Sequence, residues 1–360
     1  MVKVLHTSDI HLEKQLLNST YPSEYAVSRR NELWETTKRI LDYSKINQVD
    51  LVLIAGDLFE SEYFLLGELY RLYDLFSRYE SLRILILTGN HDSFSKNSIY
   101  KQLQAPKNVY LLCSDRIQYI EFQDLKTRVY GIGWMKDSYS EIKVSNIDLD
   151  HNYINILMLH GNLTSTDKDY MYFDINSLNK TDFDYIALGH IHSFMDLAEN
   201  IAYSGSPEPL DFGEQGEKGF IIIDVNKGAC IKNFIPFSKR KFTTHTYAFD
   251  ENSNEEEFIH EILNISNDKD FFRIYLNGVI SAELSIKLDY ILKSLMDSFY
   301  YVEFINNTYI EQYRKSMDQD PYLNEFSKYI NNLNIDDSIK ERALKKGLSM
   351  IIGDSCVNVK

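Results

Sequence analysis

Residues 84–92 read Ile-Leu-Ile-Leu-Thr-Gly-Asn-His-Asp, an apolar run that is followed at once by an amide, an imidazole and a carboxylate. Four consecutive aliphatic residues without polar alternation are typical of a short strand that is buried on both faces. The middle of such a strand has no place for polar side chains, and here they follow its end. The stretch therefore predicts a buried sheet whose strand ends carry chemically active groups.

The same arrangement occurs four more times in the first 200 residues. Strand-like runs at 2–5, 51–55, 154–159 and 184–188 lead into polar segments that contain Asp9, His11, Asp57, His160, His190 and His192. Between the runs, residues 28–47 and 65–79 place their apolar side chains on one helical face. Buried strands that alternate with amphipathic helices indicate an α/β layered core. In such folds ligands bind outside the carboxyl ends of the strands, so we expect the polar segments to meet in one crevice.

The side chains of these segments favour a metal site. The candidate ligands are Asp9, His11, Asp57, Asn90, His160, His190 and His192. A set of oxygen and nitrogen donors without thiolates suits Mn²⁺, Fe²⁺ or Zn²⁺, and it contains too many imidazoles for Ca²⁺ or Mg²⁺. Seven ligands exceed the need of one ion, and two ions that share a carboxylate can activate water to attack phosphorus. The sequence thus predicts a centre of two divalent metal ions that hydrolyses phosphoesters.

The remaining histidines and the cysteines carry no such signal. We expect the isolated histidines to be ordinary core or surface residues, namely His6, His151, His245 and His260. The three cysteines are far apart and never form a CxxC pair, which predicts reduced thiols and neither a disulfide framework nor a thiolate metal site.

Taken together, the five polar segments resemble, in order and spacing, the motifs of calcineurin-like metallophosphoesterases. The resemblance implies a layered β-sandwich core flanked by helices. It implies that one ion is bound by Asp9, His11 and His192, and that the other is bound by Asn90, His160 and His190. Asp57 is then the bridging ligand.

Two further residues of the third motif have implied roles. His91 resembles the family's catalytic histidine, which contacts the substrate phosphate and protonates the leaving oxygen rather than binding metal. We expect Asp92 to orient a neighbouring imidazole through a hydrogen bond.

A finer resemblance is to the SbcD-like bacterial DNA repair nucleases. It rests on segments 5–12, 32–40, 50–60 and 86–94, and on Ser204-Gly205-Ser206-Pro207 followed by residues 212–225. It implies a Mn²⁺-dependent DNA phosphodiesterase, an exonuclease or endonuclease in double-strand-break or DNA-end processing. The implied partners are DNA, an SMC-type (SbcC-like) ATPase and a second copy in a homodimer. One departure is Glu60, which stands where archaeal and eukaryotic relatives carry a histidine.

The last third of the chain has a different pattern. We expect the phosphoesterase domain to span 1–240 and a small α+β capping domain to span 241–308. The cap is predicted to contain strands at 242–249, 271–277 and 300–305 and helices at 255–265 and 283–297. Residues 309–360 read as a helical segment with helices at 321–333 and 337–352. These helices pack either on the chain's own core or on an ATPase partner.

Charge and hydropathy leave other functions open. The net charge is −15, which favours a rival interpretation: a phosphodiesterase or phosphatase that acts on nucleotides or cyclic nucleotides. A non-catalytic scaffold for an ATPase is a third. The basic runs Arg29-Arg30 and Lys239-Arg240-Lys241 are either phosphate contacts or solvated surface. No apolar run approaches ~20 residues and no signal-peptide pattern opens the sequence, so we expect a cytoplasmic protein without a membrane partner.

Overall fold

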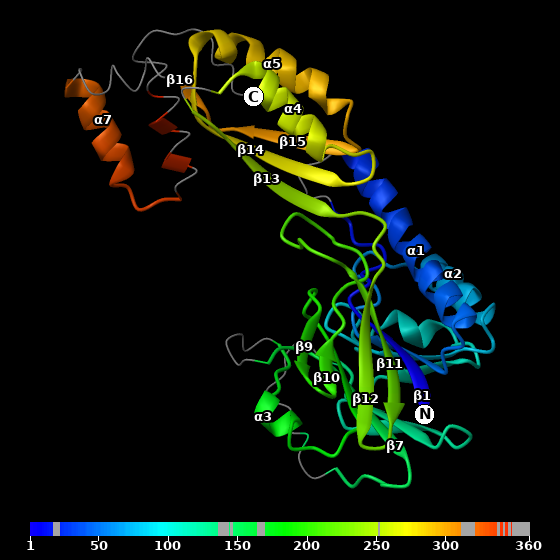
Figure 1. Ribbon diagram of the computed structural model, residues 1–360. Coiled ribbons are helices and arrows are strands. Elements are labelled where there is room, and N and C mark those ends of the chain that lie inside the picture. The colour runs from blue at the N-terminus through cyan, green and yellow to red at the C-terminus, as the bar shows by residue number, and fades with distance from the viewer. Residues whose placement is uncertain are drawn as a thin grey trace. The chain divides into compact units, whose positions relative to one another are not determined.

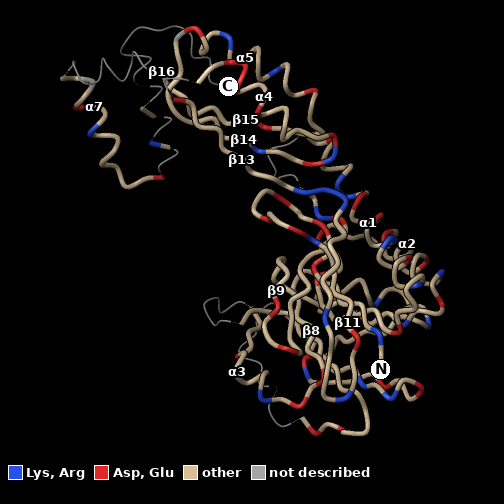
Figure 2. Tube along the Cα trace, viewed as in Figure 1, with Lys and Arg blue, Asp and Glu red and all other residues tan. Residues whose placement is uncertain are grey.

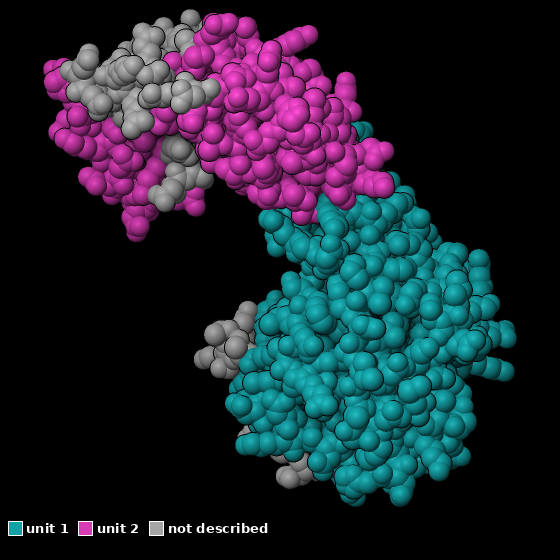
Figure 3. Space-filling view, viewed as in Figure 1, with its two compact units in different colours: residues 1–241 teal, residues 242–360 magenta. Residues whose placement is uncertain are grey.

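The computed structural model describes residues 1–16, 22–135, 144, 147–163, 170–250, 253–310, 321–336, 339, 340, 343, 344 and 347. The chain divides into two compact units, Met1–Lys241 and Phe242–Lys360 (Figure 3). Among the described residues, no helix is both long and apolar enough to cross a membrane.

The first unit contains two six-stranded sheets. In the first sheet, β1 (Val2–Thr7), β2 (Leu51–Ala55), β3 (Arg83–Leu87) and β4 (Val109–Leu112) run parallel. The antiparallel hairpin of β11 (Gly219–Asn226) and β12 (Ala229–Pro236) extends this sheet beyond β1. The carboxyl ends of β1, β2 and β3 therefore lie side by side.

The second sheet has the order β5-β6-β7-β8-β10-β9. Its parallel centre consists of β6 (Thr127–Gly131), β7 (Ile154–His160), β8 (Tyr185–Gly189) and β10 (Ile201–Tyr203). The edge strands β5 (Gln118–Phe122) and β9 (Met195–Ala198) are antiparallel to their neighbours. The short helix α3 (Ile175–Leu178) precedes β8, and β7 ends at His160 itself.

Alternate side chains of the buried strands face two different cores. Leu51 and Leu53 of β2 pack between the sheets together with Ile156 and Met158 of β7. The intervening side chains pack on the outer face against α1 (Ser23–Ile46), α2 (Leu66–Ser77) and the 3-10 turn η1 (Ile99–Gln102). Figure 1 shows α1 and α2 beside the strands of the first unit. Strands buried on both faces between layers of helix confirm the predicted α/β sandwich.

The second unit is a smaller sheet with two helices. The strands β13 (Phe242–Phe249), β14 (Phe271–Ile280) and β15 (Tyr301–Asn306) are parallel, and β16 (Tyr309–Ile310) pairs with the end of β14. Helices α4 (Glu255–Ile265) and α5 (Ala282–Met296) bury their apolar stripes against the same face of the sheet. The strands β13, β14 and β15 and both helices match the predicted elements within three residues, whereas β16 was not predicted and lies where the sequence suggested a helical segment.

Helices α4 and α5 begin where the sequence provides a capping side chain, Asn254 and Ser281. The side chain of Asn254 accepts a hydrogen bond from the backbone of Glu257, and three glutamates occupy the first turn of α4. Helix α7 (Pro321–Asn331) confirms the helix predicted at 321–333. The helix predicted at 337–352 lies mostly outside the described residues.

Four of the five residues in the basic runs form ion pairs, and Arg30 donates to the carbonyl of Gln15. Arg29 is 1% exposed, and its guanidinium contacts Glu32 at 2.5 Å and Glu208 at 3.2 Å. Both readings of Arg29 from the sequence, phosphate contact and solvated surface, are therefore wrong: it joins α1 to the segment after β10. Lys239, Arg240 and Lys241 each contact a glutamate. Acidic and basic residues are interspersed along both units (Figure 2).

Candidate metal centre

The carboxyl ends of strands from both sheets meet around one carboxylate, that of Asp57. This residue follows β2, is 1% exposed, and lies between histidines that come from different sheets. Its Oδ2 is 3.2 Å from Nε2 of His160, the last residue of β7, and 3.8 Å from Nε2 of His11, which follows β1. Asp57 thus occupies the position from which one carboxylate can contact two ions.

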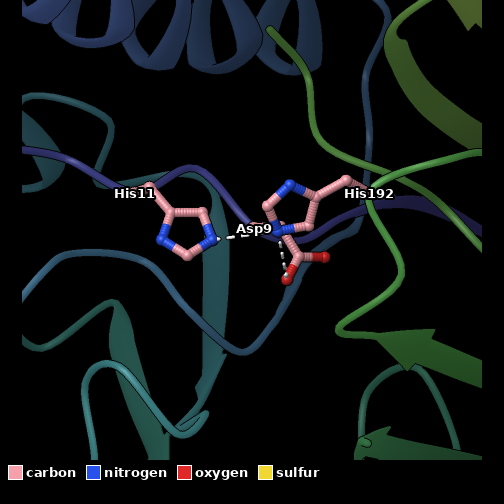
Figure 4. Close-up of side chains that lie close together, drawn as sticks. All are labelled: Asp9, His11 and His192. Atoms are coloured by element: carbon pink, nitrogen blue, oxygen red, sulfur yellow. Dashed lines mark hydrogen bonds and ion pairs between the residues drawn. The ribbon is translucent and has the colours of Figure 1, made fainter. Parts of the chain in front are cut away.

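One group of donors lies on the His11 side of Asp57. It consists of Asp9, His11 and His192, whose ligand atoms all lie within 4.8 Å of one another. The Nε2 atoms of His11 and His192 are 3.1 Å apart, and Nε2 of His192 is 3.9 Å from Oδ1 of Asp9. Figure 4 shows the two imidazoles turned toward each other beside the Asp9 carboxylate. The family resemblance implied that these three residues bind one ion.

A second group lies on the His160 side. Asp57, His160 and His190 offer ligand atoms within 4.8 Å of one another, and Oδ1 of Asn90 is 3.0 Å from Nε2 of His160. The rings of His160 and His190 are 5.3 Å apart in an edge arrangement. All seven predicted ligands are therefore brought together, in the two groups that the resemblance implied.

His91 lies at the opening of this cluster. Its side chain is 40% exposed, whereas those of Asp57 and His160 are almost fully buried. Its backbone N–H donates to Oδ1 of Asp57, and its ring lies 4.8 Å from that of His11. Because His11, Asp57 and His91 also come within 4.8 Å of one another, geometry alone does not separate His91 from the ligands. Its catalytic role stays a prediction.

The backbone of the centre is strained. Four predicted ligands have positive φ angles, which residues other than glycine rarely adopt. They are Asp9 at 53°, His11 at 51°, Asp57 at 51° and His190 at 103°. Backbone hydrogen bonds tie two of these turns together, because the N–H of His11 donates to the carbonyl of Asp57. Such conformations cost free energy and cluster at functional sites.

Two glycines allow the close approach of these side chains. A Cβ atom on Gly56 would lie 2.1 Å from Nδ1 of His160, and one on Gly89 would lie 2.2 Å from Oδ1 of Asp57. Gly56 also has a φ of +94°, in the left-handed region. The glycines of the sequence motifs are therefore required by packing around the ligands.

Sequence reasoning missed two carboxylates that orient the imidazoles. Glu60 contacts Nδ1 of His11 at 2.9 Å through Oε1 and Nδ1 of His91 at 2.6 Å through Oε2. Glu214 contacts Nδ1 of His192 at 2.6 Å. The only signal for Glu60 was its departure from the relatives that carry histidine there, and Glu214 lay in the quoted segment 212–225 without an assigned role.

The prediction that Asp92 orients an imidazole is wrong. Its Oδ1 accepts a hydrogen bond from the backbone of Gly89, and its Oδ2 accepts from the backbone of Leu58 and from the Tyr100 hydroxyl. Burial and the nearby charge of Asp57 raise the pKa of Asp92 to about 6. Asp92 therefore fixes the turns that carry Asp57 and Asn90 rather than a histidine ring.

The charges inside the centre are strongly coupled. Burial would raise the pKa of Asp57, but the neighbouring His160 outweighs this and holds it well below its usual range. Burial would lower the pKa of His160, but the charge of Asp57 raises it to about 9. Burial and the adjacent His160 lower the pKa of His190 to about 4. The buried carboxylates thus stabilise positive charge near them, either on an imidazole or on a bound cation.

The donor set fits divalent cations. The Nδ1 atoms of His11 and His192 face carboxylates, and that of His160 faces the carbonyl of Ala55 at 2.8 Å. In the tautomer that these hydrogen bonds favour, each Nδ1 is protonated and donates to the facing oxygen. The unprotonated Nε2 then directs its lone pair toward the carboxylate oxygens of Asp9 or Asp57. Lone pairs that converge in this way form a site in which a cation can be bound. The mixed nitrogen and oxygen donors suit Mn²⁺, Fe²⁺ or Zn²⁺.

Two comparisons with known proteins agree with this geometry. The model of the calcineurin-like phosphoesterase family matches residues 2–194, a range that contains all seven candidate ligands. The uncharacterized metallophosphoesterase YhaO of Bacillus subtilis (strain 168) is 26% identical over 240 residues, which cover 62% of this chain and 57% of that protein. The chain thus spans little more than half the length of this relative.

Proposed function

The chain belongs to the calcineurin-like phosphoesterase family, and we propose that it hydrolyses phosphodiester bonds in DNA with two bound Mn²⁺ ions. Family membership supports metal-dependent phosphoester hydrolysis. The observation that carries the two-metal proposal is the position of Asp57, with His11 on one side and His160 on the other. One buried carboxylate between two donor groups is what a pair of ions requires.

The seven candidate ligands divide between the two proposed ions. Asp9, His11 and His192 would hold one ion, Asn90, His160 and His190 the other, and Asp57 both. Bound ions supply positive charge to the phosphoryl oxygens and activate water for attack.

His91 would bind and protonate the substrate. Its imidazole is accessible, and Glu60 accepts the proton of its Nδ1, so its Nε2 is free to contact a phosphate oxygen or to donate a proton to the leaving oxygen. Burial lowers and the hydrogen bond to Glu60 raises the pKa of His91, with a net shift upward. This upward shift favours the protonated imidazole, which is the form that suits both tasks.

Two observations support DNA as the substrate. Residues 204–207 and 212–225, which resemble SbcD-like nucleases, reach the centre through Ser206 and Glu214, which both contact His192. His91 is 40% exposed, so a phosphodiester within a long chain could reach it. On this proposal the protein trims DNA ends or cuts DNA near breaks, together with an SMC-type ATPase.

A small-molecule phosphodiesterase is the second candidate. The net charge of −15 favours it, because an acidic surface repels a polyanion at long range while a single nucleotide is repelled less. The metal centre and the role of His91 would be the same. Only the substrate decides between the candidates.

The test uses the purified chain with three substrates in Mn²⁺ and in EDTA: end-labelled linear duplex DNA, cyclic nucleotides, and bis-p-nitrophenyl phosphate. Shortened DNA in Mn²⁺, abolished by EDTA and by Asp57→Ala, would support the nuclease. Cleavage of the small substrates with intact DNA, also after addition of a co-purified ATPase, would favour the second candidate. No turnover of any substrate would refute both, and would favour the scaffold for an ATPase.

A further inference from the structure

His192 differs from the other ligands on its side of the centre in how it is held. The side chains of Asp9 and His11 are 0% and 1% exposed, while that of His192 is 26% exposed. His192 lies three residues beyond the end of β8, on a connection between strands. Its direction therefore has to be fixed by contacts other than those of a sheet.

The segment from Ser206 to Lys218 supplies these contacts at both ends of the residue. Oε1 of Glu214 lies 2.6 Å from Nδ1 of the His192 ring. Nζ of Lys218 donates to the His192 carbonyl at 2.6 Å, and the backbone N–H of Ser206 donates to the same carbonyl at 3.1 Å. Ring and backbone of His192 are thus attached to one segment.

The Glu214 carboxylate is itself fixed. Its second oxygen accepts from Nζ of Lys218 at 3.2 Å, from Oγ of Ser206 at 3.2 Å and from the backbone of Leu210 at 3.3 Å. Lys218 is 2% exposed, and a buried ammonium is costly unless it is paired, so this contact is not easily broken. If the carboxylate rotated away from His192, the buried ion pair between Glu214 and Lys218 would be broken as well.

We propose that Glu214, held by Lys218, is the positioning residue that presents the Nε2 lone pair of His192 to the metal shared with Asp9 and His11. By accepting from Nδ1, Glu214 selects the tautomer whose Nε2 is free, and it fixes the rotation of the ring. The inference rests on the dimetal centre of the proposed function. It predicts a specific defect at one of the two ions, because hydrogen-bond partners of metal ligands typically contribute 10- to 100-fold to metal affinity.

The test is a titration of Mn²⁺ into metal-free protein by isothermal calorimetry, with wild type, Glu214→Gln and the matched control Glu217→Gln. Glu217 lies in the same segment but pairs with Lys241 and is half-exposed. We expect wild type and the control to bind two ions alike, and Glu214→Gln to bind one ion about 10- to 100-fold more weakly with the other unchanged. Equal affinities in Glu214→Gln and wild type, or an equal loss at both sites, would overturn the inference. Absence of Mn²⁺ binding by wild type would instead refute the dimetal function on which it rests.

A second measurement covers the case in which Glu214→Gln does not fold, as judged by circular dichroism. In Zn²⁺-loaded wild type, ¹⁵N NMR identifies the protonated nitrogen of each imidazole. The inference requires a proton on Nδ1 of His192 and metal contact through Nε2. A His192 ring bound through Nδ1 would overturn it.

Discussion

Glu60→Gln tests whether one carboxylate holds two imidazoles of the centre. The side chain of Glu60 is 11% exposed, and its two oxygens contact Nδ1 of His11 and Nδ1 of His91. The amide in the variant has a single acceptor oxygen, so one imidazole N–H loses its partner. A hydrogen bond to a charged group contributes about 1.5–3 kcal/mol. At ~1.36 kcal/mol per tenfold, the expected loss is roughly 10- to 150-fold in kcat/KM.

The assay is hydrolysis of bis-p-nitrophenyl phosphate in Mn²⁺. The matched control is Glu62→Gln, which makes the same substitution at an exposed glutamate two residues away. If Glu60 acts through His91, Glu60→Gln should have little further effect when His91 is already alanine, as a double-mutant cycle would show. Activity of Glu60→Gln within twofold of wild type would refute the role of the carboxylate. Full additivity of the two substitutions would refute its action through His91.

Three further predictions follow from the contacts of single residues. Asp57→Ala should abolish hydrolysis and lower the content of both metals, measured by elemental analysis, because both ions lose a ligand; full metal occupancy would contradict the bridge. His91→Ala should keep both metals and lower kcat by ~10²–10⁴-fold, and loss of the metals would make His91 a ligand instead. Burial lowers the pKa of His6 from 6.5 to about 3, so between these values the unfolded chain binds a proton that the folded protein does not. His6 should therefore contribute a fall of about 2 kcal/mol in the free energy of unfolding from pH 7 to pH 5, measured in urea and EDTA as the difference between wild type and His6→Asn. His6→Asn should lack this decrease, and equal pH slopes for the two proteins would refute the assignment.

The fold and the meeting of the candidate ligands at one place could be predicted because they follow from local rules. Uninterrupted apolar runs such as 84–87 give buried strands, and parallel strands place their carboxyl ends at one edge. Residues directly after those ends, such as Asp57 and Asn90, must then lie near one another. The proximity of Asp57 and Asn90 could be inferred without knowing the order of the strands or the existence of a second sheet.

The supporting carboxylates could not be predicted in the same way. The chain has 53 aspartates and glutamates, and nothing local distinguishes Glu214 from the others. Its contact with His192 depends on how the segment after β10 folds back over β8. Asp92 was misjudged for the related reason that its neighbours in space, Leu58 and Tyr100, offered it better donors than any imidazole.

The spread of the centre along the chain has a consequence for synthesis. Its parts run from Asp9 to Glu214, and His160, His190 and His192 belong to the later half of that span. Ribosomes add about 5–20 residues per second, so roughly 10–40 s separate the first of these residues from the last. During this time the nascent chain already carries Asp9, Asp57 and Asn90 but lacks the groups that complete either ion site. The two-ion centre therefore cannot be completed until nearly the whole first unit has been made, and a chain that ends before residue 190 lacks one predicted ligand of each ion.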